Sequence, residues 1–80
     1  MQTIYAKLEK GMDSFIRVSS TLRRKEFEIS GMNLQVIPSE PGRHEMQITL
    51  HGSNPQTANR AMRQLAKLID VHSIHLIQEA

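Results

Sequence analysis

The spacing of apolar residues along the chain predicts six elements of secondary structure. Residues 3–9 alternate between apolar and polar side chains, a pattern typical of a half-buried strand. A helix is expected next, capped by Asp13 or Ser14 and closed by the basic run 23–25, whose cations complement the carbonyl end of the helix dipole. Its apolar residues recur at helical spacing and are Phe15, Val18 and Leu22. We interpret the basic run as a solvated last turn rather than as a phosphate site.

The next strand, at about residues 27–37, changes phase partway along its length. Its apolar residues move from odd to even positions after Ile29, so a single inward face needs one extra residue. A bulge at Ser30-Gly31 would supply that residue, because glycine makes the irregularity least costly. The turn-forming residues 38–42 then predict a hairpin.

The second half of the chain is again predicted to form a strand, a helix and a strand. Residues 43–52 alternate cleanly and predict a strand whose inward residues are His44, Met46, Ile48 and Leu50. Ser53-Asn54-Pro55 predicts a helix start, a capping side chain followed by proline at the first helical position, and Asp70 is expected to end that helix. Its apolar stripe comprises Ala58, Ala61, Met62, Leu65, Leu68 and Ile69. A last strand, 71–77, is apolar enough that we expect it beside other strands rather than at an exposed edge.

The order strand, helix, strand, strand, helix, strand favours an α+β fold of the ferredoxin-like type. This βαββαβ sandwich has a four-stranded antiparallel sheet with both helices on one face. Crossover handedness puts the first and third strands in the centre. We expect residues 1–80 to form one such domain, whose second sheet face stays in water or is covered by a partner.

Composition narrows the class of protein without assigning a function. The 80 residues include 10 Lys and Arg and 8 Asp and Glu, a net charge of +2, and these charges are spread along the sequence. We therefore predict no nucleic-acid partner, a view that the presence of only three aromatic residues supports. The absence of cysteine excludes disulfides and thiolate metal sites. No apolar run or signal-peptide pattern predicts a membrane segment, so we expect a cytoplasmic protein.

The polar residues give no pattern typical of a catalytic or metal site. The carboxylates are scattered, and a grouping of Asp70, His72 and Ser73 lacks the glycines of a nucleophile elbow. His72 and His75 differ by three positions on a predicted strand, which places them on opposite faces and prevents joint chelation. We therefore predict no catalytic, cofactor-binding or metal-binding residue in this chain.

Two motifs carry a resemblance to a known family. The segment 13–32 resembles the opening of ACT domains, in which a helix with the motif L-x-R-V leads through R-R-G-[YF]-x-I into a strand. The matching positions are Phe15, Arg17, Val18, Arg23, Arg24, Phe27, Ile29 and Met32. The segment 64–71, Q-L-A-K-L-I-D-V, is similar to the end of the second helix in the regulatory small subunit of acetolactate (acetohydroxyacid) synthase. The resemblance covers about residues 4–77, and the length of 80 residues points to the short type II small subunit.

This resemblance implies a non-catalytic regulatory or activating subunit. In the family, such a subunit binds a catalytic large subunit and raises its activity early in valine, leucine and isoleucine biosynthesis. The catalytic subunit holds thiamine diphosphate, a divalent metal (Mg) and FAD, so no cofactor is expected in this chain. The resemblance also implies a homodimer formed through ACT domains, with no nucleic acid and no membrane among its partners.

The resemblance further implies where an effector or a partner would bind. In feedback-inhibited members, valine lies between two ACT domains, held by an Asn- and Gly-rich loop after the first strand and by an Asn entering the second strand. The corresponding effector or interface residues are Lys10, Gly11, Met12, Asp13, Ser14 and Glu28. Lys10 and Asp13 stand where the loop has Asn and Gly, and Glu28 stands at the second Asn, so strong valine feedback is not expected. Arg17 is a candidate contact with the catalytic subunit.

A second function class remains open from the sequence. The chain could be a stand-alone ACT sensor that binds another amino acid at a dimer interface through the loop 11–14. Stabilisation of the free protein by an amino acid would distinguish this sensor from a subunit that acts only within a complex.

Overall fold

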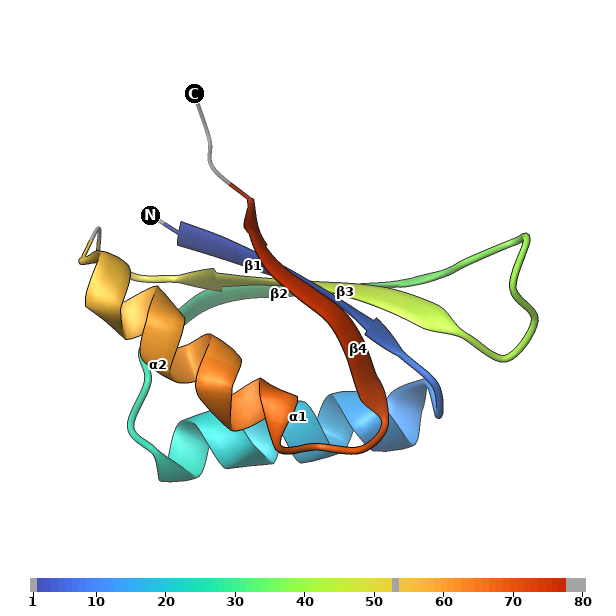
Figure 1. Cartoon of the computed structure of the whole chain (residues 1–80), viewed down its shortest axis with the longest axis horizontal. Helices are drawn as coiled ribbons and strands as arrows, with labels where there is room; N and C mark the ends of the chain where they lie inside the picture. Colours follow the sequence, from blue (N-terminus) through green and yellow to red (C-terminus); the bar gives the residue numbers. More distant parts are fainter. Residues whose placement is uncertain (1, 53, 78–80) are drawn as a thin grey trace.

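A computed structural model describes residues 2–52 and 54–77 of the chain. Its elements in chain order are β1 (Gln2–Leu8), α1 (Met12–Arg24), β2 (Ile29–Val36), β3 (His44–Leu50), α2 (Pro55–Ala66) and β4 (Val71–Ile77). The strands form one sheet in the order β2-β3-β1-β4, with every neighbouring pair antiparallel. Both helices cover the same face of this sheet (Figure 1). The predicted ferredoxin-like topology, with β1 and β3 in the centre, is confirmed.

The core lies between the two central strands and the helices. The inward side chains of β1 and β3 are almost completely buried, as their alternating pattern predicts. Helical residues spaced three or four apart meet them from α1 and α2. The fully buried apolar side chains of these elements are Ile4, Ala6, Leu8, Val18, Leu22, Met46, Ile48, Leu50, Ala58, Ala61 and Leu65. Because these residues form one cluster with members from both layers, the core holds the helices on the sheet.

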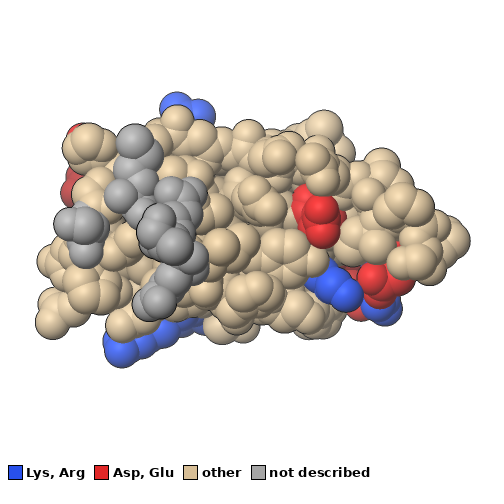
Figure 2. All heavy atoms as spheres, turned by 90° about the horizontal axis from the view of Figure 1, so that it is seen from above, with Lys and Arg blue, Asp and Glu red and all other residues tan. Residues whose placement is uncertain are grey.

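The opposite face of the sheet has no helix over it. Figure 2 looks onto this open face, where a group of acidic and basic side chains lies toward the hairpin between β2 and β3 and other charged side chains are seen at the rim. Tyr5 lies there between Gln47 of β3 and His75 of β4, because residues paired across antiparallel strands share a face.

β4 lies at an edge of the sheet, which corrects the expectation that it lies beside other strands rather than at an exposed edge. Its inward residues Val71, Ile74 and Leu76 pack against the core, and α2 packs over the strand. The apolar surface of β4 is thus buried by a helix on one face rather than by a second neighbouring strand.

Two register shifts interrupt the ladders. The predicted bulge at Ser30-Gly31 is confirmed, since the β2–β3 register shifts between Ile29 and Gly31. A second, unpredicted shift lies in the β1–β4 ladder, where Ser73 has a positive φ of 54°.

The shift at Ser73 corrects the prediction that His72 and His75 lie on opposite faces. His72 is paired with Lys7 and His75 with Tyr5, and these partners are two residues apart on β1. Both histidines therefore lie on the open face, because the bulge adds the one residue that reverses the parity argument.

The helix ends agree with the sequence in part. Asn54 caps α2 by accepting a hydrogen bond from the Gln56 backbone N–H at 3.0 Å, with Pro55 at the first position; Ser53 lies outside the described residues. The cap of α1 is Gly11, and not Asp13 or Ser14 as predicted.

The end of α2 also differs from the prediction. The helix stops at Ala66 rather than at Asp70, and Ile69 is 84% exposed instead of lying in the core. Asp70 is only 5% exposed and is held by hydrogen bonds to α1, so the chain must leave the helix early to bring this carboxylate inward.

Neither helix in the described ranges is long and apolar enough to cross a lipid bilayer.

Candidate functional site

The loop between β1 and α1, where the sequence predicted an effector or interface site, is built around Gly11. This glycine is buried and has φ of +52°, a conformation that side chains with a Cβ rarely adopt. A Cβ added to Gly11 would lie 2.8 Å from Cε1 and 2.9 Å from Nδ1 of His44, the first residue of β3. The His44 imidazole therefore fills the space next to the Gly11 backbone, and its buried Nδ1 has no hydrogen-bond partner among the described residues.

A polar cluster fastens the start of α1 to the segment before β4. The Ser14 hydroxyl donates to Asp70 Oδ2 at 3.3 Å, and Arg17 Nη1 donates to the same oxygen at 2.9 Å. The Lys10 backbone N–H donates to Ser14 Oγ at 3.2 Å, and the Glu9 N–H donates to the Asp70 carbonyl at 2.9 Å. Buried carboxylates require such partners, so this cluster defines how the loop leaves β1.

Arg17 and Ser14 thus have internal roles that the sequence did not predict. The Arg17 side chain remains 51% exposed, yet its guanidinium is already paired with the Asp70 carboxylate. Ser14, predicted as a cap or loop residue, is 1% exposed. The only hint in the sequence was the acidic residue Asp70 directly before the apolar strand 71–77. That position alone does not reveal that Asp70 pairs with Arg17, 53 residues earlier in the chain.

The remaining loop residues face outward beside exposed apolar side chains. Lys10 and Asp13 are exposed, and Met12 is 59% exposed. Ile16, one turn further along α1, and Val36, which pairs with His44 at the same end of the sheet, are also more than half exposed. We call Met12, Ile16 and Val36 the apolar edge.

Glu28 does not join the loop within one chain. It directly precedes β2, whose first residue Ile29 pairs with Leu50, and Leu50 pairs with Gln2 at the far end of β1. The loop follows Leu8 at the other end, about 20 Å away at the rise of about 3.3 Å per strand residue. A site that uses both Glu28 and the loop can form only between two chains.

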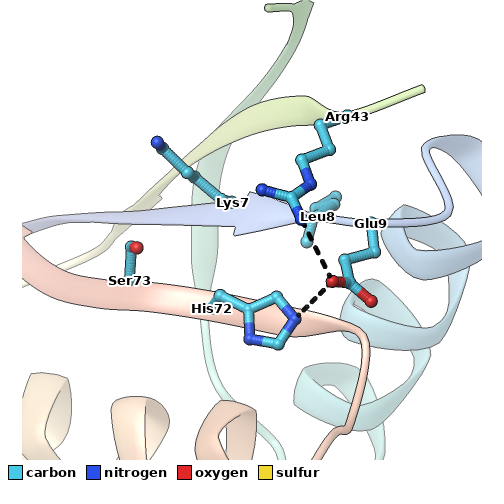
Figure 3. Close-up of a pocket in the computed structure, with 6 residues that line it drawn as sticks. All are labelled: Lys7, Leu8, Glu9, Arg43, His72 and Ser73. Atoms are coloured by element: carbon cyan, nitrogen blue, oxygen red, sulfur yellow. Dashed lines mark ion pairs between the residues drawn. The ribbon is translucent and has the colours of Figure 1, made fainter. Parts of the chain in front are cut away.

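A pocket of about 300 Å³ opens beside the sheet at the loop end, and no pattern in the sequence predicted it. Figure 3 shows its lining residues, which come from β1, β4 and the start of β3: Lys7, Leu8, Glu9, Arg43, His72 and Ser73. Glu9 Oε1 lies 3.1 Å from His72 Nε2 and 3.7 Å from Arg43 Nη2.

The same network continues into the hairpin. Glu40 bridges Arg43 Nη1 at 3.0 Å and Lys7 Nζ at 3.2 Å. These hydrogen bonds, first that of Lys7 and then that of Arg43, hold the pKa of Glu40 below its usual value. Nearby, burial and the hydrogen bond donated to Glu45 raise the pKa of Tyr5. We call Lys7, Glu9, Glu40, Arg43 and His72 the paired network, in which each carboxylate contacts two basic groups.

The geometry gives no metal centre in the part of the chain that the structure describes. No group of three or more histidine, aspartate and glutamate side chains is placed to hold an ion. His72 Nε2 lies within hydrogen-bonding distance of Glu9 Oε1. The His75 ring lies against Tyr5 with ring centroids 4.8 Å apart.

Solved structures with this arrangement belong to several kinds of protein. The acetolactate synthase small subunit of Thermotoga maritima superposes with a TM-score of 0.83 at 19% identity, over 96% of this chain and 47% of that chain. The ACT domain of a GTP pyrophosphokinase from Chlorobium tepidum gives 0.76 at 13% identity, over 95% of both chains. The C-terminal domain of the MgtC protein from Mycobacterium tuberculosis gives 0.63 at 13% identity, over 96% of this chain and 86% of that one.

These likenesses establish the fold and nothing more, because all three sequence identities are below 20%. The chain spans about half the length of the Thermotoga subunit. Its sequence has no significant match among curated proteins. The family model of the ACT domain, however, matches residues 2–74, nearly the whole described fold. The chain therefore belongs to the ACT domain family.

Proposed function

We propose that this ACT domain acts as a regulatory or activating small subunit of acetolactate synthase, with no catalytic residues of its own. The observation that carries the proposal is the segment Gln64–Val71, which resembles the end of the second helix in those subunits. In the folded chain this segment supplies Leu65 to the core and Asp70 to the cluster with Arg17. The likeness of fold to the Thermotoga small subunit agrees with this proposal.

The proposed subunit lacks strong feedback by valine. An amino-acid ligand at the loop would meet the exposed carboxylate of Asp13, and at a dimer interface also that of Glu28, both of which repel its own carboxylate. The imidazole of His44 already occupies the space beside Gly11. These features favour a loop that serves contact between proteins rather than ligand capture.

A homodimer completes the proposal. Exposed apolar side chains grouped on one side are typical of an interface, and the apolar edge lies beside the loop that the family uses between domains. A small apolar core also gains stability from association. We propose that two copies meet along β2 and the start of α1.

The direct test mixes this protein with the catalytic subunit encoded beside it and measures acetolactate formation. We expect stimulation of the catalytic subunit, co-purification of the two proteins and little change when valine is added. A lack of stimulation combined with a lack of co-purification would exclude the proposal.

A stand-alone amino-acid sensor is the second candidate function. The fold agrees with this role as well, because it is shared with the ACT domain of the Chlorobium GTP pyrophosphokinase and not only with the Thermotoga subunit. A thermal-shift screen of the free protein against the amino acids tests this candidate. A sensor should gain stability with its ligand, whereas the proposed subunit should not respond.

A further inference from the structure

The two layers of the molecule carry very different charge. Seven of the 10 basic residues lie on the helices or their C-caps, together with only one of the 8 acidic residues, Asp13. The basic residues are Arg17, Arg23, Arg24, Lys25, Arg60, Arg63 and Lys67. The charges are spread along the sequence but not over the folded molecule. The small net charge therefore hides a helix layer in which basic residues outnumber acidic ones.

A groove between the two helices gathers part of this charge. The part that both helices line, about 350 Å³, is formed by Thr21, Arg24, Lys25, Gln64, Lys67 and Leu68. A hollow of about 370 Å³ shares Arg24 and adds Ser20 and Arg23. We call this combined surface the basic groove. Arg60 lies at its end toward β2, with its guanidinium 5.3 Å from the centre of the Phe27 ring.

The cations of the basic groove lack the ion pairs found elsewhere in the molecule. Within residues 2–52 and 54–77, Arg23, Arg24, Lys25 and Lys67 form no salt bridge, whereas Lys7, Arg17 and Arg43 each do. The C-terminal ends of the helices account for part of this charge, since each end carries about −0.5 of an elementary charge. Four cations exceed that demand, so the groove keeps a positive field after the helix ends are satisfied.

An exposed apolar side chain adjoins these cations. Ile69 is 84% exposed and directly follows Leu68, which lines the groove beside Lys67. A large aliphatic residue in water next to unpaired cations is a combination found where proteins associate, because the aliphatic residue gains by burial and the cations select an acidic surface.

The composition of the groove distinguishes among partners. Nucleic acid is disfavoured, because single strands bind through exposed aromatic rings, and here Tyr5 is on the sheet while Phe15 and Phe27 pack against the core. A second copy of the chain is also disfavoured, because a two-fold contact would oppose like charges across the groove. An acidic protein surface with an apolar recess fits both the cations and Ile69.

We propose that the basic groove and Ile69 form the surface that docks onto an acidic patch of the partner protein. The inference rests on the proposed function, in which that partner is the catalytic subunit. It places the docking surface over the groove between α1 and α2, whereas the proposed contact with a second copy involves β2 and the start of α1.

The test measures binding of the full chain to the catalytic subunit by isothermal titration calorimetry, together with acetolactate formation. We expect Arg24→Glu and Lys67→Glu each to weaken binding by roughly tenfold, and the double variant by roughly a hundredfold. Ile69→Ser should also weaken binding. Asn33→Glu is the control, since it adds a negative charge at an exposed residue of β2 that pairs with Gln47 on the open face of the sheet, and it should change binding by less than about twofold.

Each result separates the inference from the function on which it rests. Failure of the wild-type chain to bind the catalytic subunit would overturn both. Binding by the folded double variant as tight as the wild type, with circular dichroism unchanged, would overturn the docking surface alone. The same conclusion would follow if the double variant abolished self-association in sedimentation, or if a labelled single-stranded RNA bound the groove more tightly than the catalytic subunit does.

Discussion

The paired network and the basic groove show two uses of charge in one small fold. In the network, Glu40 and Glu9 each contact two basic groups, which tie the hairpin to β1 and β4. In the groove, the exposed cations Arg23, Arg24, Lys25 and Lys67 form no salt bridge with a described carboxylate. The difference teaches that the net charge of +2 says little about binding, because the paired charges serve the fold and only the unpaired ones remain available to a partner.

The largest expected effect comes from removing the core that supports both regions. Leu65 lies on α2, is fully buried and forms part of the core cluster. We expect Leu65→Ala to lower the free energy of unfolding by ~2–5 kcal/mol, because it leaves a cavity under the helix layer. Denaturant titration measures this loss, and activation should fall with the folded fraction. Leu65→Met is the control and should cost less than about 1.5 kcal/mol.

A smaller effect on stability is expected at Gly11, where the loop after β1 packs against His44 of β3. Gly11→Ala places a Cβ against His44 and forces a residue with a side chain into positive φ. We expect a loss of about 1–3 kcal/mol in the free energy of unfolding. The double variant Gly11→Ala/His44→Ala should recover only the part due to the clash. A single variant as stable as the wild type would show that the loop relaxes freely.

Arg17 sharpens the comparison further, because it is the helix-layer cation that is paired. Arg17→Ala leaves the buried Asp70 carboxylate with Ser14 as its remaining side-chain donor. We therefore expect the free energy of unfolding, measured by thermal or chemical denaturation, to fall by about 1–2 kcal/mol. Lys67→Glu changes an unpaired cation and should cost less stability than Arg17→Ala, about 0.3–1 kcal/mol from the negative end of the α2 dipole, while weakening partner binding. If Arg17→Ala instead spared stability and abolished activation, Arg17 would belong to the docking surface.

The smallest effect is expected in the paired network and depends on pH. The pKa of Glu40 is lowered by Lys7 and Arg43, so its stabilising contribution is present above the usual glutamate value and is lost as pH falls through the lowered pKa. Glu40→Gln should remove this contribution at neutral pH and flatten the acid side of the stability curve slightly. Denaturation midpoints of the two proteins should therefore differ at neutral pH and converge in acid; a constant difference at every pH would contradict the assignment.

The sequence predicted the sheet, its central strands and the Ser30-Gly31 bulge, because alternation and helical spacing report directly on which faces are buried. It failed where distant contacts override local pattern. Asp70 leaves the helix to meet Ser14 and Arg17, which exposes Ile69, and Ser73 adopts a positive φ that no local residue pattern required.

The candidate site was predicted only as a set of positions in the chain. The loop residues 10–14 are consecutive in the chain, but the close approach of His44 to Gly11 depends on the pairing of β3 with β1. The paired network and the basic groove are likewise assembled from residues far apart in sequence. A single sequence gives the sign of each charge and not its partners, so the division into paired and unpaired cations became visible only in the fold.

The register shift at Ser73 also affects how the molecule avoids aggregation. It divides the pairing of β4 with β1 into a run of three residue pairs and a run of two, so the outer edge of β4 offers no long straight ladder to an incoming strand. The bulge of β2 lies at its beginning, which leaves regular backbone from Met32 to Val36 at the other edge. Unwanted strand addition is thus blocked on one side of the sheet, and any growth of the sheet is directed to β2.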